Sequence, residues 1–264
     1  MCITMDLHTH TLYSRHRHGK GTVEENVRAA RDKGIGVAIS DHGPGHGIYG
    51  VKPRWYPKLR QDIDRENDRA GARVALLGVE ANLMDWDGRL DVEKMPFAPD
   101  VMLFGYHRGV LPTSGAAVGF WEKALLHPAR CEEAMTKAVC RAMERYPVDV
   151  LTHPGDAVPV DVRTVARAAA RLGVVLEINN THGLDPALLR IAMEEGAYFI
   201  LQSDAHRPER VGCVEHSRLQ AAEAGLPESR IVNSPAYDWN GTLRIDRLRT
   251  FVENLPQLST AAPR

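Results

Sequence analysis

The chain contains 264 residues, of which 44% are hydrophobic and 25% charged, and its formal net charge at pH 7 is -1. This composition is typical of a globular protein with a buried core, and the charge argues against a broadly basic nucleic-acid-binding surface while remaining compatible with a local basic patch. Because the 4 cysteines lack zinc-finger or redox spacing, and we find neither a secretory signal nor an apolar stretch near the roughly 18 residues of a membrane span, we expect a soluble, cytoplasmic protein.

The first predicted strand covers residues 2–7 and ends in the sequence DLHTH at residues 6–10. Side chains two residues apart lie on the same face of an extended segment, so His8 and His10 can point at one position. Neutral imidazole is the commonest nitrogen ligand of zinc and similar ions. The pair therefore indicates a metal site, with a surface position or a hydrogen-bonded core position as the alternative for each histidine.

Further short apolar segments follow the first strand, and helical patterns separate them. Thr22 and Glu25 have capping-box spacing at the start of the first helix, and Asp185 with Pro186 opens a later one. We predict further strands over residues 37–39, 74–79, 101–106, 148–151, 174–178 and 198–201, and helices over residues 22–34, 57–70, 129–145, 162–172 and 215–224. The loops between them include a basic loop (14–21), a loop rich in glycine and proline (43–57) and an insertion (108–128).

Short apolar strands that alternate with helices indicate a parallel sheet with helices packed on it. In an open doubly wound sheet, the functional residues usually gather at one switch point. Here nearly every predicted strand ends in histidine, aspartate or glutamate. This distribution favours an α/β barrel, whose functional residues sit at the carboxyl ends of the strands, around one mouth.

Nine side chains of metal-ligating type lie at or near these strand ends. One ion typically takes about four to six ligands, so two or three ions fit the set better than one. A single histidine at a strand end is also compatible with an ordinary hydrogen-bonded residue, but the recurrence on strand after strand favours a metal centre. His16 lies in the basic loop and can fold back over the mouth. The predicted ligands are His8, His10, His16, His42, Glu80, His107, His153, Asp204 and His206.

Four ordered motifs give the sequence a specific family resemblance. The segments DLHTH (6–10), SDHG (40–43), THPG (152–155) and SDAH (203–206) resemble the first to fourth motifs of the PHP (polymerase and histidinol phosphatase) superfamily, and the resemblance covers about residues 3–216. Glu80 and His107 match the ligands that the family places between its second and third motifs. The short first loop with His16 and the EINN stretch at 177–180 are most similar to the YcdX-like stand-alone phosphatase branch.

This resemblance implies a distorted (β/α)7 TIM-like barrel in a single PHP domain, residues 1–264, with the barrel over about residues 3–232 and a tail over about 233–264. It also implies three divalent ions, zinc first, with manganese or iron as alternatives. Asp6 and Asp41 adjoin predicted ligands and are interpreted as hydrogen-bond acceptors for imidazole N–H groups, with surface or capping roles as the alternative. By position, the resemblance places the first ion among His8, His10, Glu80 and Asp204, the second among Glu80, His107 and His153, and the third among His16, His42 and His206.

The expected activity is hydrolysis of small phosphomonoesters by in-line attack of a metal-bridging hydroxide, because metal-bound water has a pKa near 7. A protein nucleophile is not required, and the sequence contains no GxSxG signature. His46 and His182 lie in loops on the expected mouth side, where each is either a general acid or a bystander. Candidate substrate contacts are Arg15, Arg17, His18, Arg108, His182 and Arg207, each with a solvated side chain as the alternative; His18 is placed outside the metal ligands.

Three other functions remain open at this point. PHP domains also occur fused to DNA polymerases, so a nuclease or DNA-processing module is one alternative, which the near-neutral charge and the lack of a polymerase segment weaken. A non-catalytic, metal-dependent regulatory domain is another, and the intact ligand set argues against it. Histidinol-phosphate phosphatase is a narrower version of the expected activity. We therefore expect a small phosphorylated substrate, no membrane and no nucleic-acid partner.

Overall fold

The computed structural model describes residues 2–112 and 115–256, and within them the predicted strands form one 7-stranded sheet. Neighbouring strands pair in chain order, and every pair is parallel. This arrangement confirms the predicted α/β fold. The strands are β1 (Met5–Thr9), β2 (Gly36–Ile39), β3 (Ala75–Asn82), β4 (Val101–Gly105), β5 (Val150–Leu151), β6 (Val175–Asn179) and β7 (Phe199–Gln202).

The sheet curls until its first strand meets the residues that follow its last strand. The backbone N–H of His10 donates to the carbonyl oxygen of Ala205 over 2.8 Å, and the N–H of Ala205 donates to the carbonyl oxygen of His8 over 3.1 Å. Thr9 and Ala205 form a parallel bridge. The strands therefore make a nearly closed barrel, and the histidines of the first motif lie at the seam, beside the fourth motif.

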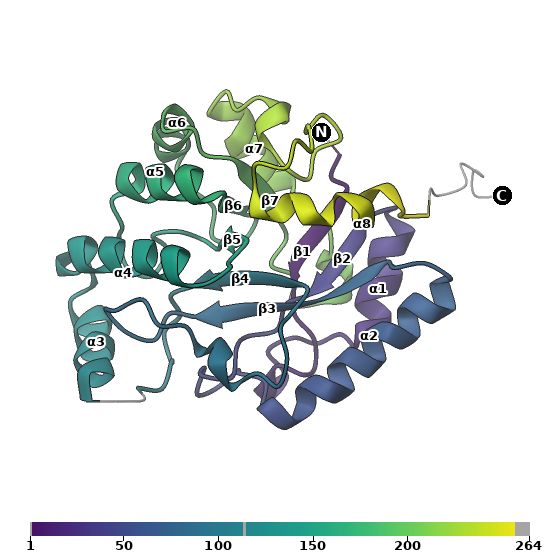
Figure 1. Ribbon diagram of the computed structural model, residues 1–264, viewed down its shortest axis with the longest axis horizontal. Coiled ribbons are helices and arrows are strands. Elements are labelled where there is room, and N and C mark those ends of the chain that lie inside the picture. The colour runs from purple at the N-terminus through teal and green to yellow at the C-terminus, as the bar shows by residue number, and fades with distance from the viewer. Residues whose placement is uncertain (1, 113–114, 257–264) are drawn as a thin grey trace.

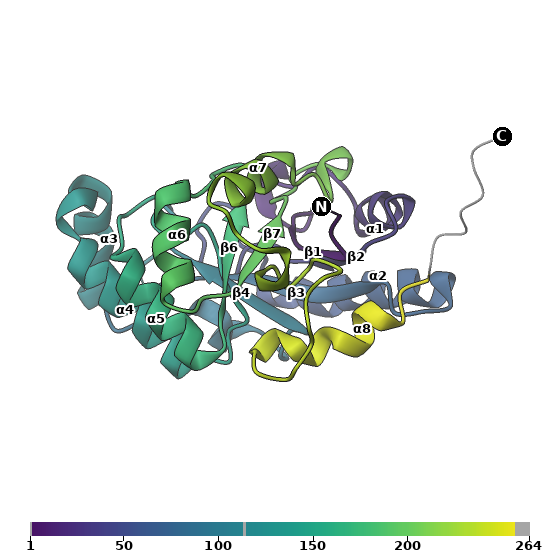
Figure 2. The same ribbon diagram turned by 90° about the horizontal axis from the view of Figure 1, so that it is seen from above.

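Helices cover the outside of this barrel, with α1 and α2 on one side of the strands and α3 to α6 on the other (Figures 1 and 2). The predicted capping box of α1 is present, because the N–H of Glu25 donates to Thr22 and the N–H of Thr22 donates to Glu25. The helices are α1 (Val23–Asp32), α2 (Tyr56–Ala70), α3 (Gly115–Leu126), α4 (Glu132–Arg145), α5 (Val162–Leu172), α6 (Pro186–Glu194), α7 (Glu215–Glu223) and α8 (Arg249–Glu253).

The alternation of side chains along β3 shows how the barrel separates its core from its site. Leu76 points inward, into an apolar cluster that fills the lower barrel together with Leu103 and Ile200. Leu77 points outward and packs in the cluster under α1 and α2. Since successive side chains alternate between faces, Glu80 lies on the same inward face as Leu76, four residues nearer the carboxyl end of the strand. An apolar floor therefore lies beneath a polar mouth.

Two segments differ from the sequence-based expectation. The predicted insertion at 108–128 contains the helix α3, which was not expected; residues 113 and 114 of the insertion lie outside the described residues. The described part of the predicted tail (233–256) packs against the amino ends of the strands. Phe251 is buried there in the lower-barrel cluster, and the backbone N–H of Arg244 donates to the carbonyl oxygen of Gly173 over 2.9 Å. This segment thus closes the barrel opposite the mouth.

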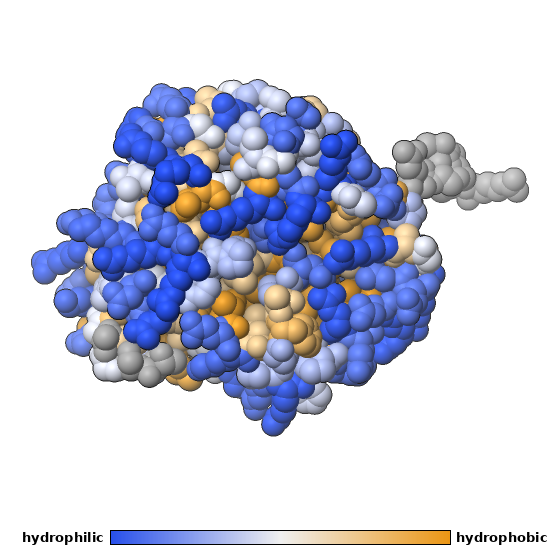
Figure 3. All heavy atoms as spheres, in the orientation of Figure 1, coloured by the Kyte–Doolittle hydropathy of each residue, from blue (hydrophilic) through white to orange (hydrophobic). Residues whose placement is uncertain are grey.

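Among the described residues, no helix is both long and apolar enough to cross a membrane. Figure 3 shows the face of the molecule that is seen in Figure 1; it is largely hydrophilic, with hydrophobic residues gathered mainly near its centre.

Candidate metal centre

Glu80 on β3 lies at the centre of the mouth and is almost completely buried. Its two carboxylate oxygens face different histidines, so this one side chain links two groups of histidines. Both oxygens are therefore placed where one carboxylate can bridge two cations. Around Oε1 lie Nε2 of His107 at 2.9 Å, Nε2 of His153 at 3.1 Å and Nε2 of His8 at 3.2 Å, while Oε2 faces Nδ1 of His42 at 3.0 Å and Nε2 of His10 at 3.6 Å.

Asp204, directly beyond β7, supplies a second buried carboxylate. Its Oδ1 lies 3.2 Å from Nε2 of His10 and 3.5 Å from Nε2 of His8. Asp204 and the ligand candidate His153 both have a positive φ, of 51° and 27°, a conformation that costs energy outside glycine and is concentrated at functional sites. The backbone thus bends at the end of β5 and near the end of β7 to turn these two side chains into the mouth.

The third group of histidines differs from the predicted one. His18, and not His16, lies beside His42 and His206, with Nε2–Nε2 distances of 3.1 Å and 2.7 Å. The side chain of His16 is exposed. The prediction for His16 therefore does not match the structure, and all the other predicted ligands converge in the mouth.

The physical reason for this exchange lies in the backbone of the first loop. His16 and Arg17 have positive φ values of 57° and 56°, so the chain turns through two left-handed residues before it reaches His18. The ring of His18 then stacks on Tyr49 with centroids 3.9 Å apart. Arg15 fixes this loop to the next one, because its guanidinium donates to the carbonyl oxygens of His46, Gly47 and Gly50.

Two ligand candidates are oriented by residues that the sequence analysis did not assign. Nδ1 of His8 lies 2.6 Å from Oε1 of Glu177, and Nδ1 of His107 lies 2.8 Å from Oδ1 of Asn82. Each oxygen is an acceptor, which places a proton on Nδ1 and makes Nε2 the nitrogen that can bind a cation. Glu177 and Asn82 are both fully buried. Glu177 lies in the middle of β6, away from the strand ends where the sequence signal was sought, and Asn82 ends β3 but is an amide and not a residue of metal-ligating type.

Asp6 and Asp41, predicted as acceptors for imidazole N–H groups, act mainly on other partners. Asp41 accepts hydrogen bonds from Thr11 and Ser14 in the first loop, and its Oδ1 lies 4.0 Å from Nδ1 of His10. Asp6 accepts from the backbone N–H groups of His8, Ser203 and Gly212 and from the Ser203 hydroxyl. Asp41 thus positions the loop that carries His18, whereas Asp6 joins β1 to the end of β7.

The electrostatics of the mouth keep the third group of histidines neutral. Burial lowers the pKa of His18 to about 3 and that of His206 to about 4, and it holds the pKa of His42 well below its usual value. Although burial opposes ionisation of Glu80 and Asp204, the surrounding histidines hold the pKa of both carboxyls well below the usual range. The third group therefore offers uncharged imidazoles beside ionised carboxylates, which are the ligand forms that divalent metals bind. Elsewhere in the mouth, although burial opposes it, the surrounding carboxylates, Glu80 first, raise the pKa of His8 and His153.

The residues in the mouth fit a set of divalent ions. Nε2 of His8 and Nδ1 of His42 are buried and make no hydrogen bond within residues 2–112 and 115–256, although carboxylate oxygens lie 3.2 Å and 3.0 Å away. Imidazole and carboxylate suit zinc, and also manganese or iron. Three overlapping groups bring ligand atoms within 4.8 Å of one another: His8 with His10 and Asp204, His10 with His42 and Glu80, and Glu80 with His107 and His153.

The predicted substrate contacts occupy different positions. The guanidinium of Arg15 is used on backbone carbonyls, while Arg17, Arg108 and Arg207 are exposed. His182 lies between two carboxylates, with Nδ1 3.1 Å from Asp156 and Nε2 3.5 Å from Asp204. These two partners, Asp156 first, raise the pKa of His182 to about 10, so its imidazole carries a positive charge at neutral pH.

His46, the other loop histidine considered as a general acid, is buried in the mouth wall. Burial lowers its pKa to about 4, and its Nδ1 accepts from the N–H of Tyr49 over 3.0 Å. The loop that carries it pairs with the loop after β4, because Gly47 N–H donates to Gly109 and Leu111 N–H donates to Gly45. The two long loops thus form one joined wall of the mouth.

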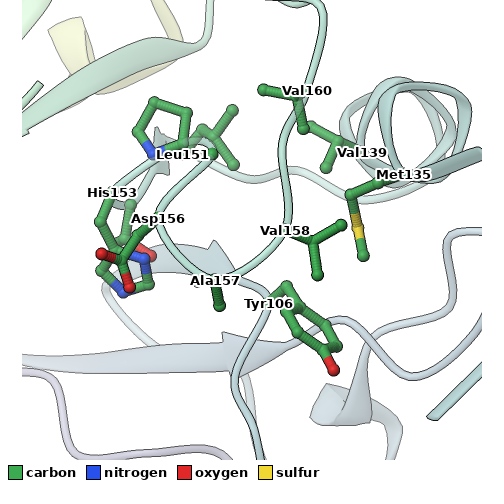
Figure 4. A pocket seen from close by; sticks show the side chains of 12 residues that line it. Tyr106, Met135, Val139, Leu151, His153, Asp156, Ala157, Val158 and Val160 are labelled. Atoms are coloured by element: carbon green, nitrogen blue, oxygen red, sulfur yellow. The ribbon is translucent and has the colours of Figure 1, made fainter. Parts of the chain in front are cut away.

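Figure 4 shows another part of the mouth wall, which holds His153. The chain from His153 to Val160 folds over a small apolar pocket, and Val158 and Val160 face Val139 and Met135 of α4. On the outer side of the same loop, a groove of about 290 Å³ runs from His182 along Val162 and Leu188 to Gln220. The loop is therefore anchored by apolar packing, and the groove beside it reaches the ligand candidates through His182, whose Nε2 lies 3.5 Å from Asp204.

Comparisons with known proteins relate the chain to phosphatases. No family model matches the chain. The chain is 31% identical over 245 residues to a protein of Aeromonas hydrophila named "probable phosphatase", covering 88% of this chain and 90% of that one. A "probable phosphatase" of Yersinia enterocolitica is 30% identical over 246 residues, covering 87% and 89%. In fold, the chain resembles the crystal structure of histidinol phosphate phosphatase from Lactococcus lactis, complexed with zinc, L-histidinol and phosphate, with a TM-score of 0.59 and 17% identity over 86% of this chain and 95% of that chain.

Proposed function

The chain belongs to the PHP superfamily and is a metal-dependent phosphatase, and from this premise we propose that it hydrolyses small phosphomonoesters. The single observation that carries the proposal is the position of Glu80, whose Oε1 and Oε2 face separate histidines within about 3 Å. A carboxylate placed in this way would hold two cations close together. Such a pair of cations suits the attacking and leaving oxygens of a phosphoryl transfer.

We assign three ions to the mouth, with zinc first and manganese or iron as alternatives. Ordinary zinc ligands, imidazole and carboxylate, supply every position. The first ion would be held by His8, His10, Glu80 and Asp204, the second by Glu80, His107 and His153, and the third by His18, His42 and His206. The third assignment replaces His16 with His18, because His18 is the histidine of the first loop that lies within 3.1 Å of His42.

When bound, the ions supply a hydroxide nucleophile at neutral pH for in-line attack and neutralise the charge of the phosphate oxygens. The chain's own residues set the conditions for this chemistry. Glu177 and Asn82 keep the rings of His8 and His107 in the orientation that frees Nε2. The positive charge of His182, at the border between the ligands and the groove, attracts the phosphate group.

The surroundings of the mouth support a small substrate over a nucleic acid. A nuclease of this kind needs a basic track for several backbone phosphates. Next to the ligands, the groove carries the carboxylates of Asp156 and Asp185, and its walls are apolar at Val162 and Leu188. Arg15 is engaged with backbone carbonyls. The groove therefore suits the uncharged or apolar part of one small phosphoester.

An activity panel tests the proposal. Purified protein, loaded with zinc or manganese, is assayed on phosphomonoesters including histidinol phosphate, on cyclic phosphates and on short oligonucleotides, with Glu80→Gln as the inactive control. We expect phosphomonoesters to be hydrolysed faster than oligonucleotides and with shallow salt dependence. Efficient cleavage of single-stranded DNA that added salt strongly inhibits would replace this function with that of a nuclease.

A further inference from the structure

We propose that Asp91 is a positioning residue of the metal centre, which fixes the side-chain amide of Asn82 and thereby the ring nitrogen that His107 presents to Glu80. The inference rests on the proposed metal site and adds to it a residue that touches no ligand side chain in the set. It follows from a series of hydrogen bonds that runs from Asp91 through Asn82 to His107, in which each contact determines which atom donates in the next.

The series of hydrogen bonds begins at Asp91, which is the first residue of the short 3-10 helix Asp91–Lys94 after β3 and is 3% exposed. Its Oδ1 accepts from the backbone N–H of Asn82 over 2.9 Å. Its Oδ2 accepts from Nδ2 of Asn82 over 2.6 Å and from the backbone N–H of Gly45 over 2.7 Å. Two of these donors are backbone N–H groups, which cannot accept a hydrogen bond, so Asp91 accepts on both of its oxygens.

The second step fixes the amide of Asn82, which is fully buried. Its Nδ2 lies against two acceptors, Oδ2 of Asp91 and the carbonyl oxygen of Gly43 at 3.2 Å. An inverted amide would place an oxygen against both of these oxygens, which is unfavourable in a buried site. Oδ1 of Asn82 must therefore face the opposite way, toward Nδ1 of His107 at 2.8 Å.

The third step decides the tautomer of His107. Because the oxygen of Asn82 can only accept, Nδ1 of His107 carries a proton, and Nε2 is the nitrogen whose lone pair would bind an ion. That Nε2 lies 2.9 Å from Oε1 of Glu80 and 3.3 Å from Nε2 of His153, which is where the second ion would bind. The opposite tautomer would place a proton in the position of the ion.

The same carboxylate also holds the loop after β2. A Cβ atom added at Gly43 or Gly45 would overlap the side chain of Asp91, so the close approach requires glycine at both positions. Gly43 directly follows His42, a ligand candidate of the third group. Asp91 thus joins the end of β3, which orients His107, to the loop that carries His42.

The variant Asp91→Asn tests this series of hydrogen bonds in metal-free protein. Its amide replaces one acceptor with a donor, which favours rotation of the Asn82 amide and turns Nδ2 toward His107. We expect the 15N NMR signals of His107, assigned by their loss in His107→Gln, to change from a protonated Nδ1 in the wild type to an unprotonated Nδ1, the Nε2–H tautomer, in the variant. We also expect zinc affinity at the second site to fall by about 10- to 100-fold.

A matched control separates positioning from stability. Asp149 is a fully buried aspartate that accepts from the backbone N–H of Met102 over 2.8 Å and pairs with Arg247, at the amino end of the strands. Asp149→Asn is expected to lower the melting temperature without changing the His107 tautomer or the zinc affinity. In the double variant Asp91→Asn with Asn82→Asp, the new carboxylate accepts from both neighbours, so we expect the Nδ1–H tautomer and part of the zinc affinity to return.

The inference is wrong if folded Asp91→Asn protein keeps the Nδ1–H tautomer and the zinc affinity of the wild type. If that variant does not fold, Asn82→Ala, which retains the bond from Gly45 to Asp91, takes its place; a mixture of His107 tautomers supports the inference and an unchanged single tautomer overturns it. Because the tautomer is measured without metal, a failure of this inference appears in the NMR spectrum, whereas a failure of the proposed function appears in the phosphatase assay.

Discussion

Nδ1 of His8 and Oε1 of Glu177 lie 2.6 Å apart in a site where neither side chain is accessible to solvent. Oε2 of the same glutamate accepts from the backbone N–H of His153 over 2.7 Å. One carboxylate in the middle of β6 therefore orients two ligand candidates, which the proposal assigns to different ions. Acceptors of this kind are often as important for metal affinity as the ligands themselves.

The first prediction concerns this carboxylate. Glu177→Gln places an amide N–H against either the His8 ring or the His153 backbone, so one hydrogen bond is lost and the ring of His8 is no longer held. We expect zinc affinity to fall by about 10- to 100-fold and activity at limiting zinc to fall with it. Calorimetric zinc titration of metal-stripped protein measures the change, and unaltered binding isotherms would show that Glu177 has only a packing role.

A second prediction separates the two histidines of the first loop. His18→Ala removes a ring that lies within 3.1 Å of both His42 and His206, whereas His16→Ala removes an exposed ring. We expect elemental analysis to show one ion fewer per chain in the first variant and an unchanged content in the second. The reverse result would restore His16 as the ligand of the third site.

A third prediction follows from the position of Glu80 between the groups. Glu80→Gln removes an anionic ligand that two ions would share, so both should bind more weakly and uncompensated positive charge should remain in the mouth. We expect activity to fall at least about 100-fold, a larger loss than that caused by His16→Ala. Near-normal turnover and metal content in Glu80→Gln would rule out the bridging assignment.

Metal binding should also be visible in the stability of the protein. Ligands that bind only the folded state stabilise it by about 2.7 kcal/mol at a concentration 100 times their Kd, which for a domain of this size corresponds to an increase in Tm of roughly 5 to 10 °C. We expect zinc to produce this shift in metal-stripped wild-type protein and a smaller one in Glu80→Gln. Equal shifts in the two proteins would indicate that zinc binds elsewhere.

The groove beside His182 gives a prediction about substrate size. Leu188→Trp should fill part of its volume of about 290 Å³. We expect KM to rise for phosphomonoesters with bulky leaving groups and to stay constant for small ones, with kcat little changed. Leu219→Trp, at a residue of α7 that is 64% exposed, is the control. Identical kinetics of Leu188→Trp on all substrates would place the leaving group elsewhere.

Much of this architecture could be predicted from the sequence, because each strand is a short apolar segment and the fold brings the strand ends to one mouth. The exchange of His16 for His18 could not be predicted in the same way. Both histidines lie in one basic loop, and the choice depends on left-handed backbone at His16 and on the contact of His18 with Tyr49. Tyr49 comes from another loop, and local sequence carries no signal of that contact.

Glu177 and α3 show two further limits of sequence analysis. Glu177 lies inside the buried run of β6, where a single carboxylate resembles an interruption of the strand and not a part of the site. Its role becomes visible only when the fold places β6 next to β5 and brings Glu177 within reach of His8 on β1. Helix α3 contains glycine and lacks a clear polar face, so its sequence does not resemble an amphipathic surface helix. In both cases tertiary packing supplied the missing information.

The central claim is that this chain is a phosphomonoesterase whose activity depends on several bound ions. Its most direct test is the rate of hydrolysis of a small phosphomonoester by metal-stripped protein, measured as zinc is added in known equivalents. The account predicts no activity without metal, little at one equivalent and a plateau at two to three equivalents per chain. Full activity in the stripped protein, or a plateau reached at one equivalent, would contradict it.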